Sequence, residues 1–112
     1  MPDDMRAVVV DEAASARLTV ARAPKPSPGR GQALIQVAAI SLNRGEVKTA
    51  MAAASGWSPG WDFAGAIVEA ADAGPPVGTR VVGGASAGAW AEFQAAPPIM
   101  LAALPGAPSS TI

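Results

Sequence analysis

The sequence predicts a mainly β domain, a partly open barrel of short strands with one or two short helices. Short β-branched or alternating runs recur along the chain, and clusters of glycine and proline separate them. The length of 112 residues suits one core, because a chain of this size buries about two-thirds of its unfolded surface. We therefore expect residues 1–112 to form a single domain.

The first half of the chain contributes three of these strands. Residues 5–10 and 17–22 are expected to form two strands joined by a loop of small residues. Residues 24–31 hold three prolines and two glycines, and we interpret them as a surface loop, because the 23 residues before them are too few to fold alone. Residues 32–42 are the longest strand candidate, and their nearly continuous apolar character predicts burial on both faces.

A short helix is expected from Asn43 to about Ala54, where strong helix formers replace the β-branched run. Asn43 is a preferred N-cap residue, and Glu46 three positions later gives a pattern close to a capping box. Ser55 and Gly56 supply the stop. The two ends of the helix are therefore both marked.

Residues 60–69 form the bend and strand around which the chain is organised. Gly60 can take a positive φ, and Gly65 allows a neighbouring backbone or ligand to approach closely. Trp61 and Asp62 are then expected to project from a tight, fixed corner, which suits a ligand site.

The last part of the chain predicts further strands at residues 80–82 and 89–95, after a turn at residues 70–76. Pro97 and Pro98 are expected to close the last strand. The glycines of residues 83–88 do not indicate a dinucleotide loop, because a strand pattern follows where a helix is required. The residues expected in the core are Val8, Val10, Leu34, Val37, Ile40, Ile67, Val81 and Phe93.

Composition excludes several classes of function. The chain has no cysteine, histidine or tyrosine, which excludes disulfides, Ser/His/Asp and Cys/His catalysis, an ordinary zinc site and a phenol proton donor. The net charge of −1 and the scattered basic residues argue against nucleic acid. The acidic start does not resemble a secretory signal, and no apolar run is long enough to cross a membrane, so we expect a cytoplasmic protein.

Four blocks in collinear order carry a family resemblance: residues 41–47 (SLNRGEV), 60–69 (GWDFAGAIVE), 77–83 (VGTRVVG) and 88–93 (GAWAEF). From Met5 to Pro105 the chain resembles the N-terminal GroES-like domain of medium-chain dehydrogenase/reductases, and most closely the zinc-free, quinone oxidoreductase-like branch. The resemblance implies a GroES-like, partly open barrel that forms the substrate side of a two-domain enzyme. The nucleotide-binding domain is expected to be absent from this chain.

The resemblance also implies which chemistry is lost and which is kept. Asn43 stands where the zinc-dependent relatives place a cysteine ligand, and Trp61 stands where they place a histidine ligand. The acid after that histidine is kept as Asp62, while Gly45 replaces the hydroxyl of the proton relay. We therefore expect a zinc-independent reductase that uses NADPH on a small, flat quinone or unsaturated carbonyl substrate.

Asn43 and Trp61 each have two open interpretations. As in the family, Asn43 would hydrogen-bond the substrate or the nicotinamide as the catalytic residue, but a helix cap explains it equally well. Trp61 would stack on a flat substrate, or it is a buried core residue. Trp57 lies where many relatives carry an aromatic residue near the cofactor, and we assign it to the substrate side.

The charged residues near this corner are also open to two interpretations. Asp62 is a substrate-binding candidate, and with Glu46 it would form an acid/base pair unless the two serve solvated or capping roles. Arg44 would meet a cofactor phosphate, or it faces solvent on the first helical turn.

The chain alone is expected neither to bind NADPH tightly nor to transfer hydride, because no strand-loop-helix phosphate cradle is evident. Apolar surface left open by the missing domain would favour self-association, in particular through the uncharged residues 99–112. The alternative is a stand-alone barrel that binds a small apolar ligand or a protein partner without redox activity. A dinucleotide-binding fingerprint downstream in the gene would favour the oxidoreductase. A genuine stop codon after Ile112 would favour the stand-alone barrel.

Overall fold

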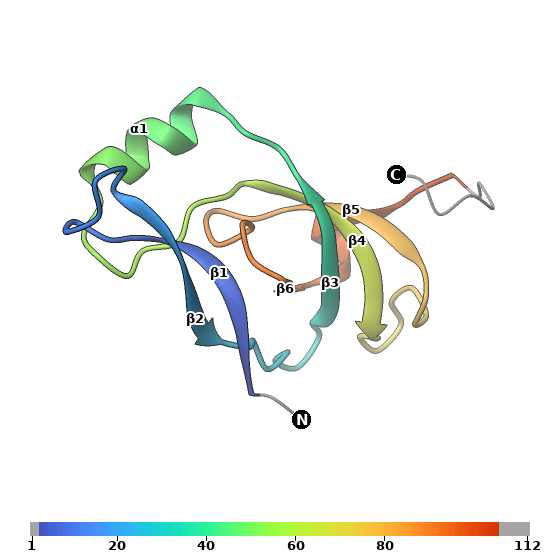
Figure 1. Ribbon diagram of the computed structural model, residues 1–112. Helices are drawn as coiled ribbons and strands as arrows, with labels where there is room; N and C mark the ends of the chain where they lie inside the picture. The colour runs from blue at the N-terminus through green and yellow to red at the C-terminus, as the bar shows by residue number, and fades with distance from the viewer. Residues whose placement is uncertain (1–2, 106–112) are drawn as a thin grey trace.

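The computed structural model describes residues 3–105, which fold into two antiparallel sheets and one α-helix (Figure 1). Strands β1 (Asp4–Val10) and β2 (Leu18–Pro24) form a hairpin. The larger sheet has the order β6-β3-β4-β5-β7. Its members are β3 (Ala33–Ile40), β4 (Asp62–Glu69), β5 (Arg80–Gly84), β6 (Phe93–Ala96) and β7 (Leu101–Ala103). Helix α1 (Arg44–Ala52) connects β3 to β4, and the short 3₁₀-helix η1 (Pro98–Met100) precedes β7.

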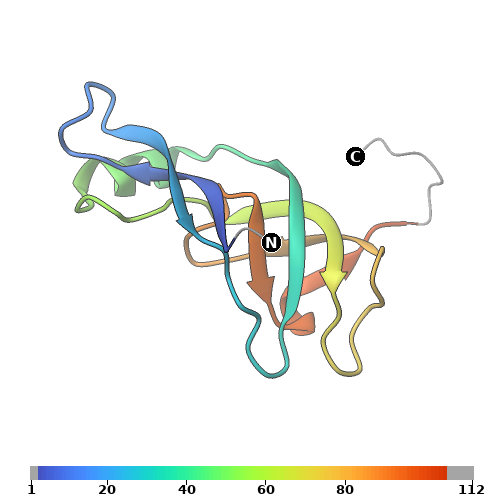
Figure 2. The same cartoon turned by 60° about the horizontal axis from the view of Figure 1, so that its bottom comes forward.

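The hairpin is joined to the larger sheet through residues 90–92, which lead into β6. Ala7 pairs with Ala91, and the backbone N–H of Val8 donates to the carbonyl of Trp90 at 2.9 Å. The edge strands β6 and β7 are not paired with each other, so the barrel is not closed. Figure 2 shows the hairpin beside α1 at one end and the larger sheet at the other. The expected mainly β, partly open barrel is confirmed.

The two glycines of the organising corner have the roles that the sequence predicts. Gly60 has a φ of +123°, and a Cβ atom there would lie 2.6 Å from the backbone nitrogen of Trp90. A Cβ atom on Gly65 would lie 2.1 Å from the carbonyl oxygen of Gln36 on the neighbouring strand. Both positions therefore exclude a side chain.

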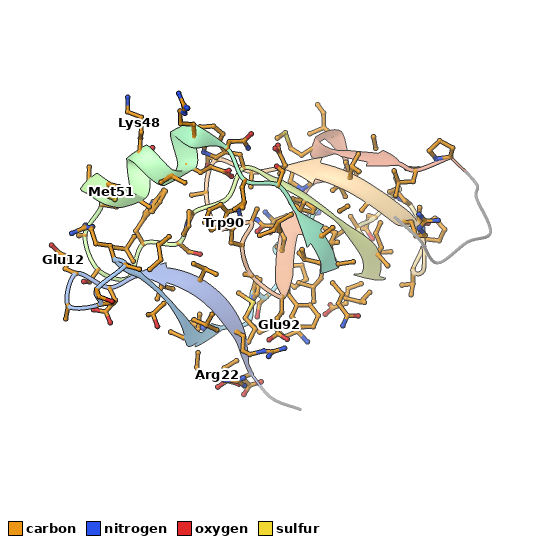
Figure 3. All side chains as sticks on the ribbon, turned by 45° about the horizontal axis from the view of Figure 1, so that its top comes forward. Glu12, Arg22, Lys48, Met51, Trp90 and Glu92 are labelled. Atoms are coloured by element: carbon orange, nitrogen blue, oxygen red, sulfur yellow. The ribbon has the colours of Figure 1, made fainter. Side chains whose placement is uncertain are left out.

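Helix α1 begins and ends close to the expected residues, with Asn43 as its N-cap. Its C-terminal end is held by the loop between β1 and β2. The guanidinium of Arg17 donates to the carbonyl of Ala53 at 2.8 Å, and Ser55 Oγ accepts from the backbone N–H of Glu12 at 2.9 Å. Figure 3 shows Glu12 beside this end of the helix and Lys48 on the outer side, away from the sheets.

The main core cluster lies on the larger sheet and the loops beside it, and its membership differs from the expected one. Its buried members are Ala33, Ile35, Phe63, Ile67, Ala71, Val81, Ala89 and Ala96. Val10 and Leu34 are also buried, as expected, whereas Val8, Val37 and Phe93 are half-buried.

The predictions that β3 is buried along its whole length and that Ile40 belongs to the core are wrong. Burial ends after Ile35, and Ile40 is 43% exposed. The pairing with β4 shifts between Val37 and Ala39, which leaves Ala38 as an extra residue in a bulge. The strand then runs to the open end of the barrel, where its faces are not covered.

Pro97 and Pro98 follow the end of β6 at Ala96, as expected, but the prediction that β6 is the last strand is wrong. Pro98 opens η1, and β7 then pairs antiparallel with β5, with Val82 opposite Ala102. The strand expected at residues 89–95 is shorter, because only residues 93–96 pair with β3. Residues 83–88 lead from β5 to the bridge at Ala91 and then to β6, which is the strand pattern that the sequence predicts after these glycines. Of the uncharged segment 99–112, residues 106–112 lie outside the described residues.

Candidate functional site

The end of β3 and the start of β4 bring three polar side chains together. Ile40 pairs with Phe63, so the residues just beyond this pair meet as the strands separate. The hydroxyl of Ser41 donates to Asp62 Oδ2 at 2.7 Å, and Asn43 Nδ2 lies 3.3 Å from the same oxygen. The Asn43 amide is also 3.4 Å from Ser41 Oγ. We call Ser41, Asn43 and Asp62 the polar cluster.

Glu46 fixes the backbone on both sides of the polar cluster. Its side chain is 0% exposed, although it lies on the first turn of α1. One carboxylate oxygen accepts from the backbone N–H of Asn43 at 2.7 Å, and the other accepts from that of Trp61 at 2.5 Å. The N-terminus of a helix also favours a negative charge. Glu46 therefore has the capping role and ties α1 to the start of β4.

The buried side chain of Trp90 anchors the backbone of Ser41, which belongs to the polar cluster. The indole N–H of Trp90 donates to the carbonyl of Ser41 at 3.1 Å, and the Trp90 side chain is only 6% exposed. Figure 3 shows Trp90 between α1 with the hairpin on one side and the larger sheet on the other. The segment that carries Ser41 and Asn43 is thus fixed from both ends, by Trp90 and by Glu46.

An open groove of about 700 Å³ begins at the polar cluster. Ser41 and Asp62 form its polar end. Among the described residues that line it, Asp62 is the only charged one, and the remainder of the surface is apolar or glycine. Its apolar side chains include Ile40, Phe63, Val82, Ile99, Met100 and Leu101.

Of the expected site residues only Asp62 lines the groove; Asn43, Trp61, Trp57 and Arg44 do not. Trp61 is 37% exposed and lies against Gly45, where a Cβ atom would be 2.4 Å from the indole ring. Trp57 is half-buried, and its carbonyl accepts from the backbone N–H of Val10 at 2.8 Å. Arg44 is exposed, and no described residue forms an ion pair with it. Trp61 is therefore connected to Asn43 of the polar cluster by the Glu46 carboxylate, which accepts from both backbone N–H groups. Trp57 makes no hydrogen bond to the polar cluster.

Sequence reasoning missed two kinds of site residue. Ser41 and Trp90 stood inside the family blocks, but no role was assigned to either. Met100 and Leu101 line the groove because β7 pairs with β5, whereas no strand was expected after Pro97 and Pro98. Small and apolar residues at residues 99–103 gave no local indication that this segment would reach the site.

The perturbed charges of the described residues lie away from the groove, on β1 and its partners. A hydrogen bond from Arg22 lowers the pKa of Asp4, and this carboxylate raises the pKa of the Arg22 guanidinium. The backbone and side chain of Arg6 donate to Glu92 and lower the pKa of its carboxylate. Figure 3 shows Arg22 and Glu92 on the side of the molecule opposite α1. These pairs support the fold and not the site.

Neither a metal nor a pyrophosphate has a ready site in the described part of the chain. Residues 3–105 contain no group of three or more carboxylate, imidazole or thiol side chains that could hold a metal ion. The N-terminus of α1, the one α-helix described, is already occupied by the Glu46 carboxylate, which would repel a phosphate. Within the same residues, no helix is of a length and apolarity to cross a bilayer.

Solved structures with the same fold are longer than this chain. A human synaptic vesicle membrane protein VAT-1 homolog-like protein is 26% identical with a TM-score of 0.83, over 95% of this chain and 37% of its own. A quinone oxidoreductase from Coxiella burnetii is 25% identical with a TM-score of 0.78, over 89% of this chain and 37% of its own. A mycobacterial protein in complex with NADPH is 29% identical with a TM-score of 0.78, over 95% and 34%. The chain therefore spans about a third of the length of these proteins.

Comparison with curated protein sequences gives no match. The sequence profile of the alcohol dehydrogenase GroES-like domain matches residues 29–106, which include the polar cluster, the groove and Trp90. The chain therefore belongs to the alcohol dehydrogenase GroES-like domain family, the N-terminal domain of medium-chain dehydrogenase/reductases.

Proposed function

We propose that the chain is the substrate-side domain of a zinc-independent, NADPH-dependent oxidoreductase that acts on quinones or conjugated carbonyl compounds. The observation that carries the proposal is the polar cluster at the end of an apolar groove, in a chain without cysteine or histidine. The groove accepts a flat apolar body, and the polar cluster orients one end of it. The similarity to a quinone oxidoreductase and to a protein bound to NADPH supports the same function.

Asn43 replaces a metal ligand in this proposal. Its amide lies next to Ser41 and Asp62, the two polar residues that line the groove, and Glu46 ties its backbone to that of Trp61. Hydride transfer to an electron-poor carbon needs orientation more than a Lewis acid, and the nicotinamide supplies the hydride when it is bound. Asn43 would orient the acceptor while it remains the N-cap of α1.

NADPH would be held mainly by a second domain, because the phosphate-binding features are missing from residues 3–105. The Glu46 carboxylate occupies the helix N-terminus that a phosphate would need. Arg44 lies at the first position of α1 and would at most reach a phosphate at the domain boundary. Exposed apolar side chains outside the groove, such as Leu42 and Val47, would then be covered by the second domain or, in the chain alone, by a second copy.

The test is NADPH oxidation with a naphthoquinone, measured for this chain alone and for the chain joined after residue 105 to the nucleotide-binding domain of a quinone oxidoreductase of the same fold. We expect no turnover and no micromolar NADPH binding for the chain alone, and turnover for the fusion. Asn43→Ala in the fusion should lower kcat/KM at least tenfold. Zinc should be substoichiometric by elemental analysis of untagged protein. Stoichiometric zinc, or turnover by the chain alone, would contradict the proposal.

A second candidate is a stand-alone domain that binds a small apolar ligand without redox chemistry. The groove favours it, because a ligand can enter the groove without a second domain. A folded fusion that binds naphthalene derivatives but never oxidises NADPH would select this function over the first.

A further inference from the structure

The polar cluster offers an acceptor to the groove, not a donor. Ser41 and Asp62 are the members of the cluster that line the groove, and the Ser41 hydroxyl already donates to Asp62 Oδ2. Asn43 does not line the groove, and its amide lies beside the same carboxylate oxygen. No described residue donates to the other carboxylate oxygen, Oδ1. Asp62 is exposed at the polar end of the groove. A bound molecule would therefore meet a carboxylate that can only accept hydrogen bonds.

The rest of the groove selects for an apolar body. Val82 and Met100 are 40% and 47% exposed, and they face the groove together with Ile40. Covering these side chains with a ring releases water from apolar surface, which is favourable. No basic side chain lines the groove among the described residues, so a carboxylate or phosphate on the ligand would be repelled by Asp62 without compensation.

We propose that the groove binds a flat aromatic molecule through a hydroxyl group that donates to Asp62 Oδ1, so that it prefers a phenol or hydroquinone to the corresponding quinone. A quinone carbonyl is only an acceptor and would face the carboxylate without a proton between them, unless it displaced Ser41 or Asn43 from Asp62. The choice of a hydroxyl over an amine rests on the proposed function, since the hydroxyl is the group that reduction of a quinone forms.

The test compares three ligands that share the fused two-ring skeleton of naphthalene: 2-naphthol, 2-methoxynaphthalene and menadione. Their dissociation constants are measured by ¹H–¹⁵N NMR titration of this chain without NADPH. We expect 2-naphthol to bind about tenfold more tightly than 2-methoxynaphthalene, as for a hydrogen bond to a charged acceptor that is partly open to water. The shifted amides should be those of the groove, including Asp62 and Gly84.

Four variants separate the hydrogen bond from the apolar contact. Asp62→Ala should abolish the preference for 2-naphthol. Asp62→Asn should reduce this preference and should strengthen the binding of menadione, because the new amide can donate a hydrogen bond to a quinone carbonyl. Met100→Ala should weaken all three ligands by a similar factor. Met51→Ala is the matched control, because Met51 is exposed on α1 and does not line the groove.

Equal binding of 2-naphthol and 2-methoxynaphthalene, or a preference for menadione in the unchanged chain, would overturn the inference. So would a preference that survives Asp62→Ala, since the hydroxyl would then bind elsewhere. None of these measurements uses NADPH or turnover. Loss of the proposed redox function in the fusion would therefore leave the hydroxyl preference standing, and loss of the preference would leave turnover unaffected.

Discussion

Glu46 accepts a hydrogen bond from the backbone N–H of Trp61, 15 residues further along the chain, while its other oxygen caps α1 at Asn43. Glu46→Ala should lower the free energy of unfolding by about 2 kcal/mol, because two part-buried N–H groups lose the acceptor that the buried carboxylate provides. Glu46→Gln keeps one acceptor and should cost about half as much. Urea unfolding measures both.

The matched control for Glu46 is Glu69→Ala. Glu69 is exposed at the end of β4, and no described residue is hydrogen-bonded to its side chain. That change should shift the free energy by less than about 0.5 kcal/mol. Equal losses at the two positions would show that the Glu46 hydrogen bonds contribute nothing specific.

Gly45 and Trp61 should be coupled. A Cβ atom on Gly45 would lie 2.4 Å from the indole, so Gly45→Ala forces the ring to move and should destabilise the protein by about 1–2 kcal/mol. In a Trp61→Ala background the clash is gone, and the same change should stabilise α1 by about 0.5–1 kcal/mol through helix propensity. A double-mutant cycle by thermal unfolding tests this, and additive effects would mean that the ring does not lie on Gly45.

Gly60 and Gly56 form a natural pair of comparison sites, because both have positive φ but only one is crowded. A Cβ atom on Gly56 meets nothing within 4 Å, whereas one on Gly60 would lie 2.6 Å from the nitrogen of Trp90. Gly56→Ala should cost about 1 kcal/mol from backbone strain alone, and Gly60→Ala about 3 kcal/mol or more. Chemical denaturation of both variants gives the difference, and equal costs would refute the close contact.

The ion pairs Arg22–Asp4 and Arg6–Glu92 make the free energy of unfolding depend on pH in the acidic range. The pKa values of Asp4 and Glu92 are lowered in the fold by Arg22 and Arg6, so unfolding lets these carboxylates take up protons more readily. Their contribution is complete above the unfolded pKa values, near pH 4, and is lost as the pH falls through the lower folded values. Asp4→Asn with Glu92→Gln should flatten the stability profile between about pH 5 and 3. An unchanged slope would show that other carboxylates cause it.

The parts that could be predicted from the sequence are those fixed by neighbours along the chain. Asn43 and Glu46 mark a helix start within four residues, and Gly60 and Gly65 mark positions where a side chain cannot fit. The class of fold followed from such local patterns, and the family resemblance placed Asn43, Trp61 and Asp62 at one corner.

The groove could not be predicted, because distant segments form it. The pairing of β7 with β5 is decided by packing, and nothing near Leu101 encodes it. Ile40 was expected in the core because an apolar strand normally finds cover, yet this one ends at the open rim of the barrel. The hydrogen bond between Ser41 and Asp62 spans 21 residues and has no local pattern either.

The indole N–H of Trp90 donates to the carbonyl of Ser41, 49 residues earlier in the chain. The polar cluster can therefore be completed only late in the synthesis of the domain. During synthesis, α1 and its cap can form as soon as the chain passes Trp61, but the carbonyl of Ser41 has no anchor until residue 90 has emerged. Contacts of such long sequence separation form late and slowly. A nascent chain shorter than 90 residues would therefore carry the helix that the site needs without the geometry that makes it a site.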